Sequence, residues 1–325
     1  MDRHDIVVIG ASAGGFAAIK ALLAPLAADF PAALFLVSHL PRGHSRLAQV
    51  LDRTSQLTVR FAEDGDTIRP GTLLIAPPDR HLLLQRERVM LSQGPRENLW
   101  RPSIDVLFRS AAVSFSTRTI GVILSGVLDD GASGLSAIHR CGGIAIAQHP
   151  ADAAYPEMPE AALRATPEAR LMTCSELPAT LEELVRQPAA PPPPIPDQIL
   201  LEARLAAGDA EARHEIEARG TGTNLSCPEC GGPLNLQPDD TLRFRCRLGH
   251  AYAIASLSSA SRDAVESSLW AAIRLLEQRA NIDLTRSNEE RAKGRGSDAE
   301  HYAGRAAEVA GHADVLREVL TKLPG

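Results

Sequence analysis

The sequence predicts an α/β fold, a doubly wound and mostly parallel sheet, within residues 1–186. Short apolar runs rich in β-branched residues recur there without polar alternation, which is typical of strands buried on both faces. Stretches of helical period separate several of these runs and indicate helices on both sides of the sheet. The apolar runs are 6–9, 33–37, 73–76, 120–124 and 144–147, and the helical stretches are 16–26, 45–53, 103–113 and 132–141.

Residues 81–91 depart from that pattern. Two apolar runs, 81–84 and 89–91, are separated by the polar segment 85–88. Two short apolar runs around a polar turn predict a β-hairpin. We therefore expect an antiparallel hairpin inserted in the α/β domain.

The rest of the chain divides into smaller parts. A proline-rich linker is expected to be extended and stiff. A polar helix follows, then a small cysteine-bearing module and a C-terminal helical hairpin. In that hairpin, Gly294 and Gly296 interrupt the first helix, and a capping-box sequence at 297–300 predicts the start of the second. The four parts are 187–197 (linker), 198–223 (helix), 224–256 (cysteine module) and 257–325 (helical hairpin).

The composition excludes several classes of protein. A net charge of −6 over 325 residues argues against non-specific binding of nucleic acid by the whole chain. The apolar run near the N-terminus is too short for a signal peptide or a membrane span, so we expect a soluble cytoplasmic protein without membrane insertion. Two of the five cysteines, Cys141 and Cys174, stand alone in apolar surroundings. We expect both to be buried and chemically inert.

A candidate nucleophile lies directly after the first predicted strand. The segment Gly10-Ala11-Ser12-Ala13-Gly14 matches the G-x-S-x-G elbow, which places a serine on a tight strand-to-helix turn. The start of the next helix would put partial positive charge near the serine oxygen. A nucleotide-binding turn is the alternative, but the second strand ends in Val37-Ser38-His39 and lacks the acidic residue that binds a ribose. The segment therefore favours a serine hydrolase.

Two further strand ends supply partners for Ser12. Loops after neighbouring parallel strands meet at the carboxyl edge of a sheet, and His39 follows the second strand directly. Of the other histidines, only His149 also comes just after a predicted parallel strand, so position favours His39 as the base. Asp129 and Asp130 follow the strand at 120–124, and a carboxylate there would orient the imidazole. The alternative for either aspartate is a helix N-cap. Further candidates for the base are His44, His81 and His139.

Six blocks of sequence carry a more specific signal. They are 8–15, 38–41, 75–82, 101–108, 124–132 and 158–159. In these blocks, and in their order, the chain resembles the catalytic domain of the chemotaxis protein-glutamate methylesterase (CheB-type) family over about residues 5–185. The chain order serine, histidine, aspartate also differs from the order of the α/β-hydrolases.

The resemblance implies an esterase that uses no cofactor for catalysis. It implies Ser12 as nucleophile, His39 as base and Asp130 rather than Asp129 as the third member. It also implies that the backbone amides of His39 and Val127 form the oxyanion hole. The implied substrates are methylated glutamates of chemoreceptor-like proteins, with deamidation of receptor glutamines as a related activity. The implied partners are these receptors and other chemosensory proteins.

Several positions depart from the pattern of the family. Ala13 stands where the family usually has threonine, Val127 where it usually has methionine, and His149 where many members have aspartate. We also expect no phosphorylatable receiver domain before the esterase, because the first strand already begins at Ile6. These departures keep a second hypothesis open, in which a diverged esterase fold and the cysteine module serve mainly to bind regulatory partners.

The cysteine module predicts a zinc site. Cys227 and Cys230 form one half-site, and Cys246 with His250 forms a second after fifteen intervening residues. Three thiolates and one imidazole complete a tetrahedral structural site, as in a zinc ribbon. Free thiols or a redox pair are the alternatives, which the second half-site disfavours. We expect removal of the metal to unfold this module and to spare the esterase.

Three arginines lie around Cys246, two on the predicted strand before it and one directly after it. They are Arg243, Arg245 and Arg247. Arginines in such a row can contact nucleic acid, but on so small a module they more often form a solvated face or a protein contact. We therefore expect one of those two roles and no nucleic-acid partner.

Overall fold

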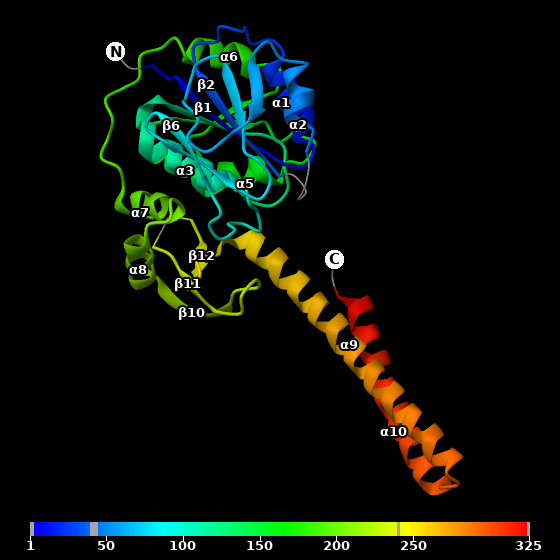
Figure 1. Ribbon diagram of the computed structural model, residues 1–325. Coiled ribbons are helices and arrows are strands. Elements are labelled where there is room, and N and C mark those ends of the chain that lie inside the picture. Colours follow the sequence, from blue (N-terminus) through cyan, green and yellow to red (C-terminus); the bar gives the residue numbers. More distant parts are fainter. Residues whose placement is uncertain (1–2, 40–44, 239–240, 324–325) are drawn as a thin grey trace. The chain divides into compact units, whose positions relative to one another are not determined.

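The computed structural model describes residues 3–39, 45–238 and 241–323. The chain forms two compact units, Met1–Leu257 and Ser258–Gly325. The first unit holds the α/β domain, the linker and the cysteine module, and the second holds the helical hairpin (Figure 1). Within the described ranges, no helix has both the length and the apolarity that a membrane span requires. His44 and the second half of the block 38–41 lie outside the described residues.

A seven-stranded parallel sheet confirms the predicted fold class. Its order is β3-β4-β2-β1-β7-β8-β9, and its register sets Ile6 beside Ala33 on one side and Thr119 on the other. The sequence patterns do not predict β3 and β9, because β3 has exposed residues and β9 is short and mostly exposed. The strands are β1 (Ile6–Ala11), β2 (Ala33–Ser38), β3 (Thr58–Phe61), β4 (Thr72–Ile75), β7 (Thr119–Ile123), β8 (Ile144–Gln148) and β9 (Arg170–Met172).

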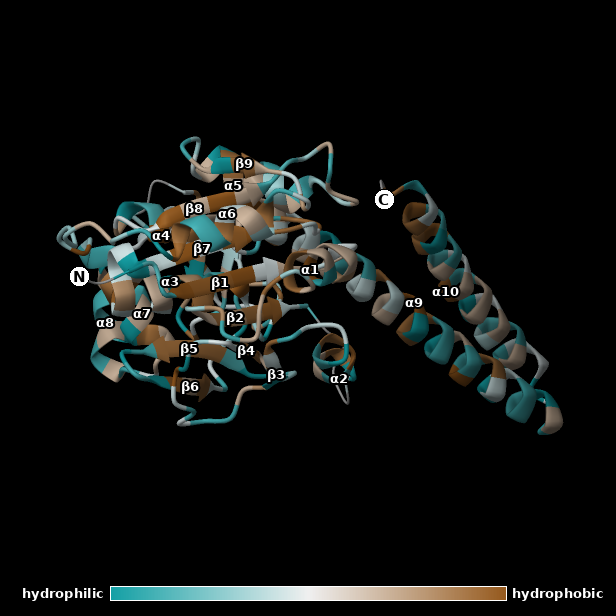
Figure 2. Ribbon diagram, turned by 90° about the horizontal axis from the view of Figure 1, so that it is seen from above, coloured by the Kyte–Doolittle hydropathy of each residue, from teal (hydrophilic) through white to brown (hydrophobic). Residues whose placement is uncertain are grey.

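Helices cover both faces of the sheet, as the unbroken apolar strands require. Val7 and Ile9 of β1 point to one face, where they join a buried apolar cluster with α1 (Gly15–Leu23), α2 (Leu47–Asp52) and α6 (Leu177–Leu184). Ile6 and Val8 point to the other face. Burial of such side chains stabilises the fold by about 1.5–3 kcal/mol each. Brown apolar strands lie between the two helical layers in Figure 2.

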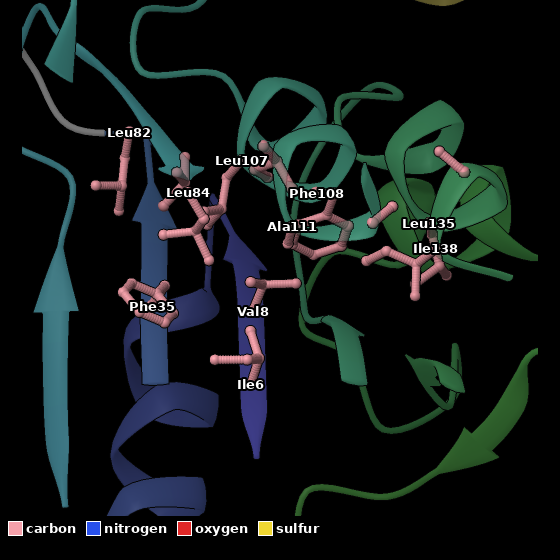
Figure 3. Close-up of a cluster of buried hydrophobic side chains, with 14 of the residues drawn as sticks. Ile6, Val8, Phe35, Leu82, Leu84, Leu107, Phe108, Ala111, Leu135 and Ile138 are labelled. Carbon is pink, nitrogen blue, oxygen red and sulfur yellow. The ribbon is translucent and has the colours of Figure 1, made fainter. Parts of the chain in front are cut away.

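The second face also carries the predicted antiparallel hairpin. Leu82 and Leu84 of β5 pack with Phe35 and with Leu107 in one apolar cluster (Figure 3). The remaining elements of this layer are β5 (His81–Gln85), β6 (Arg88–Ser92), α3 (Ile104–Phe115), α4 (Ala132–Arg140) and α5 (Glu157–Ala165), and a 3-10 turn at Ser116–Arg118 leads into β7. The inserted hairpin is therefore part of the core of the α/β domain.

The region predicted as one polar helix over 198–223 forms two helices, α7 (Asp197–Ala206) and α8 (Ala210–Arg219). The single-helix prediction is wrong because Gly208, with φ +91°, turns the chain. The Asp209 carboxylate then caps α8 by accepting from the amides of Glu211 and Ala212. A four-stranded antiparallel sheet follows: β10 (Thr221–Ser226), β11 (Pro233–Leu236), β12 (Arg243–Cys246) and β13 (Ala251–Ala253).

The C-terminal hairpin consists of α9 (Ile254–Ala292) and α10 (Gly296–Lys322), which lie side by side in opposite directions (Figure 1). The predicted break at Gly294 is present. The predicted capping box is wrong, because Ser297 lies within α10 and the N-cap residue Arg295 makes no side-chain capping bond. Buried residues recur every seven positions, as in a coiled coil. They are Ile273, Ala280 and Ser287 on α9 and Ala299, Ala306 and Ala313 on α10.

Candidate active site and metal centre

The strand order brings the three predicted catalytic residues to one edge of the sheet. Ser12 follows β1, His39 follows β2 and Asp130 lies in the loop after β7, and β1 pairs with both of the other strands. The chain leaves β1 toward β2 and later returns on its other side at β7. Such a point of reversal forms the crevice in which open α/β sheets bind their ligands.

Ser12 lies on a tight strand-to-helix turn, as predicted. The Ser12 amide donates to the Ser125 carbonyl at 3.0 Å, and the Ser12 carbonyl accepts from the Gly15 amide at 2.9 Å. Gly14 adopts φ +70°, a conformation that favours glycine. Gly126 lies directly against this turn, since a Cβ on it would come within 2.9 Å of the Ser12 Cβ. The two glycines therefore allow the turn and the close packing that fix the serine.

The three side chains form one hydrogen-bonded chain. Ser12 Oγ lies 3.0 Å from His39 Nδ1, and His39 Nε2 lies 2.8 Å from Asp130 Oδ2. The side chains of His39 and Asp130 are each only 1% exposed. With the Nε2 proton donated to the carboxylate, Nδ1 is left to accept the serine proton. The two ring nitrogens therefore exchange places relative to the Ser-His-Asp template: here Nδ1 faces the serine and Nε2 faces the carboxylate, whereas in the template Nε2 faces the serine.

Asp130 is held ionised by a full set of donors. Besides His39, its carboxylate accepts from Asn98 Nδ2 at 2.9 Å, from Ser103 Oγ at 2.8 Å and from the Ile104 amide at 2.7 Å. Burial alone would raise the pKa of Asp130, but these hydrogen bonds outweigh it and hold the pKa below its ordinary value. The carboxylate therefore carries the charge that an imidazolium needs beside it.

Asp129, the neighbouring aspartate, has different hydrogen-bond partners. Its carboxylate accepts from the amides of Ala255 and Ser256 and from the Ser256 hydroxyl at the start of α9. One aspartate thus bonds to the histidine and the other caps a helix. The capped helix is α9, whereas α4, which follows the two aspartates directly, has Gly131 as its N-cap.

The predicted oxyanion donors lie on either side of the serine turn. The His39 amide donates to the Ala11 carbonyl over a long 3.3 Å. Val127 is flanked by two amides with firm partners: Gly126 donates to the Tyr155 carbonyl at 3.0 Å, and Leu128 donates to the Glu157 carboxylate at 2.8 Å. These two bonds fix the peptide segment that carries the Val127 amide.

The other candidate bases have different partners. His81 is buried, accepts from the Ser103 amide through Nδ1 and lies 2.9 Å from the Pro95 carbonyl through Nε2. His149 accepts from the amide of Ala151, and His139 lies near Glu168 on the surface. None of these contacts involves Ser12.

Sequence reasoning missed two residues that touch the predicted catalytic side chains. Trp100 stacks on the His39 ring, with centroids 4.2 Å apart and an angle of 6° between the planes. Asn98 is fully buried and bonds to Asp130. Their only sequence signal is that they stand just before the block at 101–108. No periodicity or spacing marks a residue in such a loop as a contact of a distant strand end.

The four predicted metal ligands meet at one place. The ligand atoms of Cys227, Cys230, Cys246 and His250 all lie within 4.8 Å of one another. Cys230 Sγ is 3.6 Å from Cys246 Sγ, and His250 Nδ1 is 3.5 Å from Cys246 Sγ. These separations suit a tetrahedron whose metal–sulfur bonds are about 2.3 Å long. The cluster is therefore close enough to bind a metal ion.

The surroundings of the four ligands also fit a metal. His250 Nε2 lies 3.2 Å from the Glu229 carboxylate, so the ring's second nitrogen is oriented by an acceptor, as is usual for metal-bound histidines. The Tyr252 hydroxyl lies 3.5 Å from Cys227 Sγ. Of the two isolated cysteines, Cys141 is buried as predicted, whereas Cys174 is only half-buried.

The expectation of a solvated arginine face is wrong for two of the three arginines. Arg243 and Arg245 are 1% and 4% exposed and form ion pairs within the chain, whereas Arg247 is exposed. They belong to a buried charge cluster, which joins α3, α7, β12 and the loop before Trp100. Its members are Glu97, Arg109, Glu202, Arg243 and Arg245. The sequence left open a protein contact for these arginines, and for Arg243 and Arg245 it is a contact of the cysteine module with the α/β domain.

Comparison with known proteins agrees with this geometry. The CheB methylesterase family matches residues 7–181. A protein-glutamate methylesterase/protein-glutamine glutaminase of Yersinia pestis is 44% identical over 168 residues, which are 50% of this chain and 48% of that protein. Protein-glutamate methylesterase/protein-glutamine glutaminase 2 of Anaeromyxobacter dehalogenans is 42% identical over 185 residues, 57% of this chain and 54% of that protein. The chain spans about half the length of these curated relatives.

A solved structure also matches more than half of the chain. The crystal structure of the Thermotoga maritima CheB methylesterase catalytic domain is 35% identical, with a TM-score of 0.54, and the match covers 56% of this chain and 98% of that one. The family match covers more than half of the chain and includes the strand ends that carry Ser12, His39 and Asp130. The chain therefore belongs to the CheB methylesterase family.

Proposed function

We propose that this protein hydrolyses the methyl esters of glutamate side chains on chemoreceptor-like proteins. The observation that carries the proposal is the continuous hydrogen-bonded chain from Ser12 Oγ through His39 to Asp130. A serine with a base in contact and a carboxylate behind the base is the arrangement of a nucleophilic hydrolase. The names of the relatives supply the substrate class, including deamidation of glutamine as a related activity.

The proposed reaction proceeds through an acyl-enzyme. His39 Nδ1 accepts the proton of Ser12 Oγ while the oxygen attacks the ester carbonyl carbon. The tetrahedral intermediate collapses, and His39 returns the proton to the departing methoxide, which leaves as methanol. Water then loses a proton to His39 and attacks the acyl carbon, His39 passes that proton to the departing Ser12 oxygen, and the glutamic acid product releases its remaining proton to solvent. Asp130 stabilises the imidazolium that forms in both halves.

We propose the Val127 amide as the principal oxyanion donor and the His39 amide as the second. The bonds from Gly126 and Leu128 to their acceptors support the first assignment, because they orient the peptide between them. The 3.3 Å bond from the His39 amide to Ala11 is long enough for that amide to be shared with an oxyanion. Loss of one such donor typically costs about 10²–10³ in rate.

The proposed function is tested by methanol release from a chemoreceptor fragment methylated on its glutamates. We expect Ser12→Ala to lower the rate on the order of 10⁶-fold while circular dichroism shows an intact fold. Ser175→Ala, at an exposed serine, is the matched control and should leave the rate unchanged. Release of methanol by Ser12→Ala at the wild-type rate, or no release by the wild type, would overturn the proposal.

We further propose that the cysteine module binds one structural zinc ion through Cys227, Cys230, Cys246 and His250. A full set of three thiolates and one imidazole, oriented by Glu229, supports a closed site with no position for a substrate. The ion would serve to fold the module. Because thiolate ligands require a reducing compartment, we place the proposed reaction in the cytoplasm. Elemental analysis should find one zinc per chain, and Cys230→Ser should lose it.

A further inference from the structure

One short loop contacts both the catalytic residues and the cysteine module. We call residues 96–100 the clamp loop. On the catalytic side, Asn98 Nδ2 donates to Asp130 Oδ1 at 2.9 Å and to Asp105 Oδ2 at 2.8 Å. Two residues later, Trp100 stacks on the His39 ring. The loop thus touches two of the three catalytic side chains, although neither contact reaches Ser12.

The other side of the clamp loop is bonded to β13. The Asn98 amide donates to the Ala251 carbonyl at 2.8 Å, and the Ala253 amide donates to Asn98 Oδ1 at 2.8 Å. The Ala251 amide also donates to the Arg96 carbonyl at 3.3 Å. The single side chain of Asn98 therefore has its amide nitrogen on the catalytic carboxylate and its oxygen on the cysteine module.

Buried charges fix the same loop from a second direction. The Glu97 carboxylate lies 2.5 Å from Arg109 of α3, 2.9 Å from Arg243 and 3.2 Å from Arg245, both of β12. All four side chains are at most 4% exposed. Separating a buried ion pair leaves an uncompensated charge inside the protein, which is strongly unfavourable. The loop and β12 are therefore expected to move together.

The strands that hold the clamp loop are themselves joined through the metal ligands. Cys246 is the last residue of β12, and His250 directly precedes β13. The Cys246 amide donates to the His250 carbonyl at 3.0 Å, which closes the turn between them. Two of the four ligands thus set the spacing of β12 and β13, on which the clamp loop rests.

We propose that Asn98 is a positioning residue for the Asp130–His39 pair and that the metal-bound cysteine module holds Asn98 and Trp100 in place. The inference rests on the proposed esterase function and deepens it, because it makes the metal centre part of what orients the catalytic residues. It also replaces the expectation that the esterase works independently of the module. In this chain the two lie in one compact unit, Met1–Leu257.

The first test is Asn98→Gly. Asn98 adopts φ +51°, which glycine accepts without strain, so the backbone bond to Ala251 is kept while the side chain is lost. A misplaced catalytic group can cost on the order of 10²-fold, and we expect a fall of that size in kcat with KM little changed. Asn98→Asp keeps the acceptor for Ala253 but removes the donor to Asp130, and we expect a loss at least as large. Wild-type kcat in either variant would overturn the positioning role.

The pH profile separates positioning from a general loss of folded protein. Without the Asn98 donor, the Asp130 carboxylate loses one of the hydrogen bonds that hold its pKa down, so the pKa of Asp130 should rise. The acid limb of the kcat/KM profile in Asn98→Gly should therefore move to higher pH. Partial unfolding would instead lower kcat/KM by the same factor at every pH and leave the position of the limb unchanged. An unmoved limb would overturn the role. The titratable groups that face Asp130 are His39, His81, Asp105 and Asp129.

The second test measures the coupling to the metal without relying on catalysis. The chain has two tryptophans, so Trp270→Phe leaves Trp100 as the only one. We expect extraction of zinc from this full-length variant to change the Trp100 emission, because the stacking on His39 loosens, and to lower kcat. Added zinc should restore both. Unchanged emission and unchanged kcat in the metal-free protein would refute the coupling. Absence of methanol release by the zinc-loaded protein would instead count against the proposed function, and the emission would still test the coupling.

Discussion

The α/β core and the cysteine module are stabilised in opposite ways. The core has two large apolar clusters, one on each face of the parallel sheet. The module has four short strands and few fully buried apolar side chains, such as Leu234 and Tyr252, and its strand β10 is mostly exposed. A module of this size rarely forms a sufficient core alone. It must therefore depend on the metal ligands and on the buried charges it shares with the core.

The buried polar contacts of the two regions have different roles. In the core, hydrogen bonds to Asp130 serve the catalytic residues and the apolar clusters supply the stability. In the module, Arg243 and Arg245 are themselves structural. Replacing a polar group should thus affect rate in the first region and folding in the second.

The largest expected effect is on rate and lies in the core. Asp130→Asn should lower kcat by about 10⁴-fold with an unchanged fold, because the carboxylate that orients and stabilises the imidazolium is lost. Its neighbour provides the control: Asp129→Asn keeps an acceptor for the α9 amides and should retain kcat. An equal fall of methanol release in both variants would contradict the separate roles of Asp130 and Asp129.

The next effect is on stability and lies where the module meets the core. Glu97→Gln removes one of the two carboxylates that pair with three buried arginines, the other being Glu202, and should lower the free energy of unfolding by about 3–5 kcal/mol. Arg60→Gln, which breaks an ion pair in which the Arg60 side chain is 45% exposed, should cost no more than about 1 kcal/mol. Chemical denaturation measures both. Equal losses would mean that the buried cluster does not hold the module.

The smallest expected effect is a dependence of stability on pH. Burial and the nearby Asp130 raise the pKa of Asp105 to about 7, although Arg243 opposes them. Between the ordinary carboxyl pKa and 7, the folded state then binds more protons than the unfolded state. This group's contribution to stability therefore falls as the pH rises through that range, by at most about 1.4 kcal/mol per pH unit. The loss is complete about one pH unit above the folded-state pKa and is constant from there.

The variant Asp105→Asn isolates that effect. Its free energy of unfolding should fall less than that of the wild type between pH 5 and pH 7, as measured by urea denaturation at each pH. Parallel curves for the two proteins over this range would show that Asp105 is already ionised at pH 5.

The sequence predicted those site residues whose signals are local. Ser12 lies in a short motif, His39 and Asp130 follow recognisable strands, and the metal ligands have a characteristic spacing. Asn98 and Trp100 could not be predicted in the same way, because their partners come from strands far away in the chain. The pairing of Glu97 with Arg243 spans nearly half of the sequence and depends on how the module packs.

The fold shows the same limit. Unbroken apolar runs predicted the central strands, whereas the half-exposed edge strands β3 and β9 have no such run. The break between α7 and α8 did have a local signal, a glycine followed by the capping residue Asp209, and a prediction that weighed it would have found two helices.

The adjacent carboxylates Asp129 and Asp130 also constrain how this loop can change in evolution. The Asp129 carboxylate accepts from the first turn of α9, and the Asp130 carboxylate bonds to His39, the proposed base, with a single peptide bond between the two residues. Insertion or deletion of one residue between Gly126 and Asp129 would displace both carboxylates at once. We therefore expect homologues that share the α9 attachment to keep the length of this loop fixed, even where the identity of Val127 and Leu128 varies.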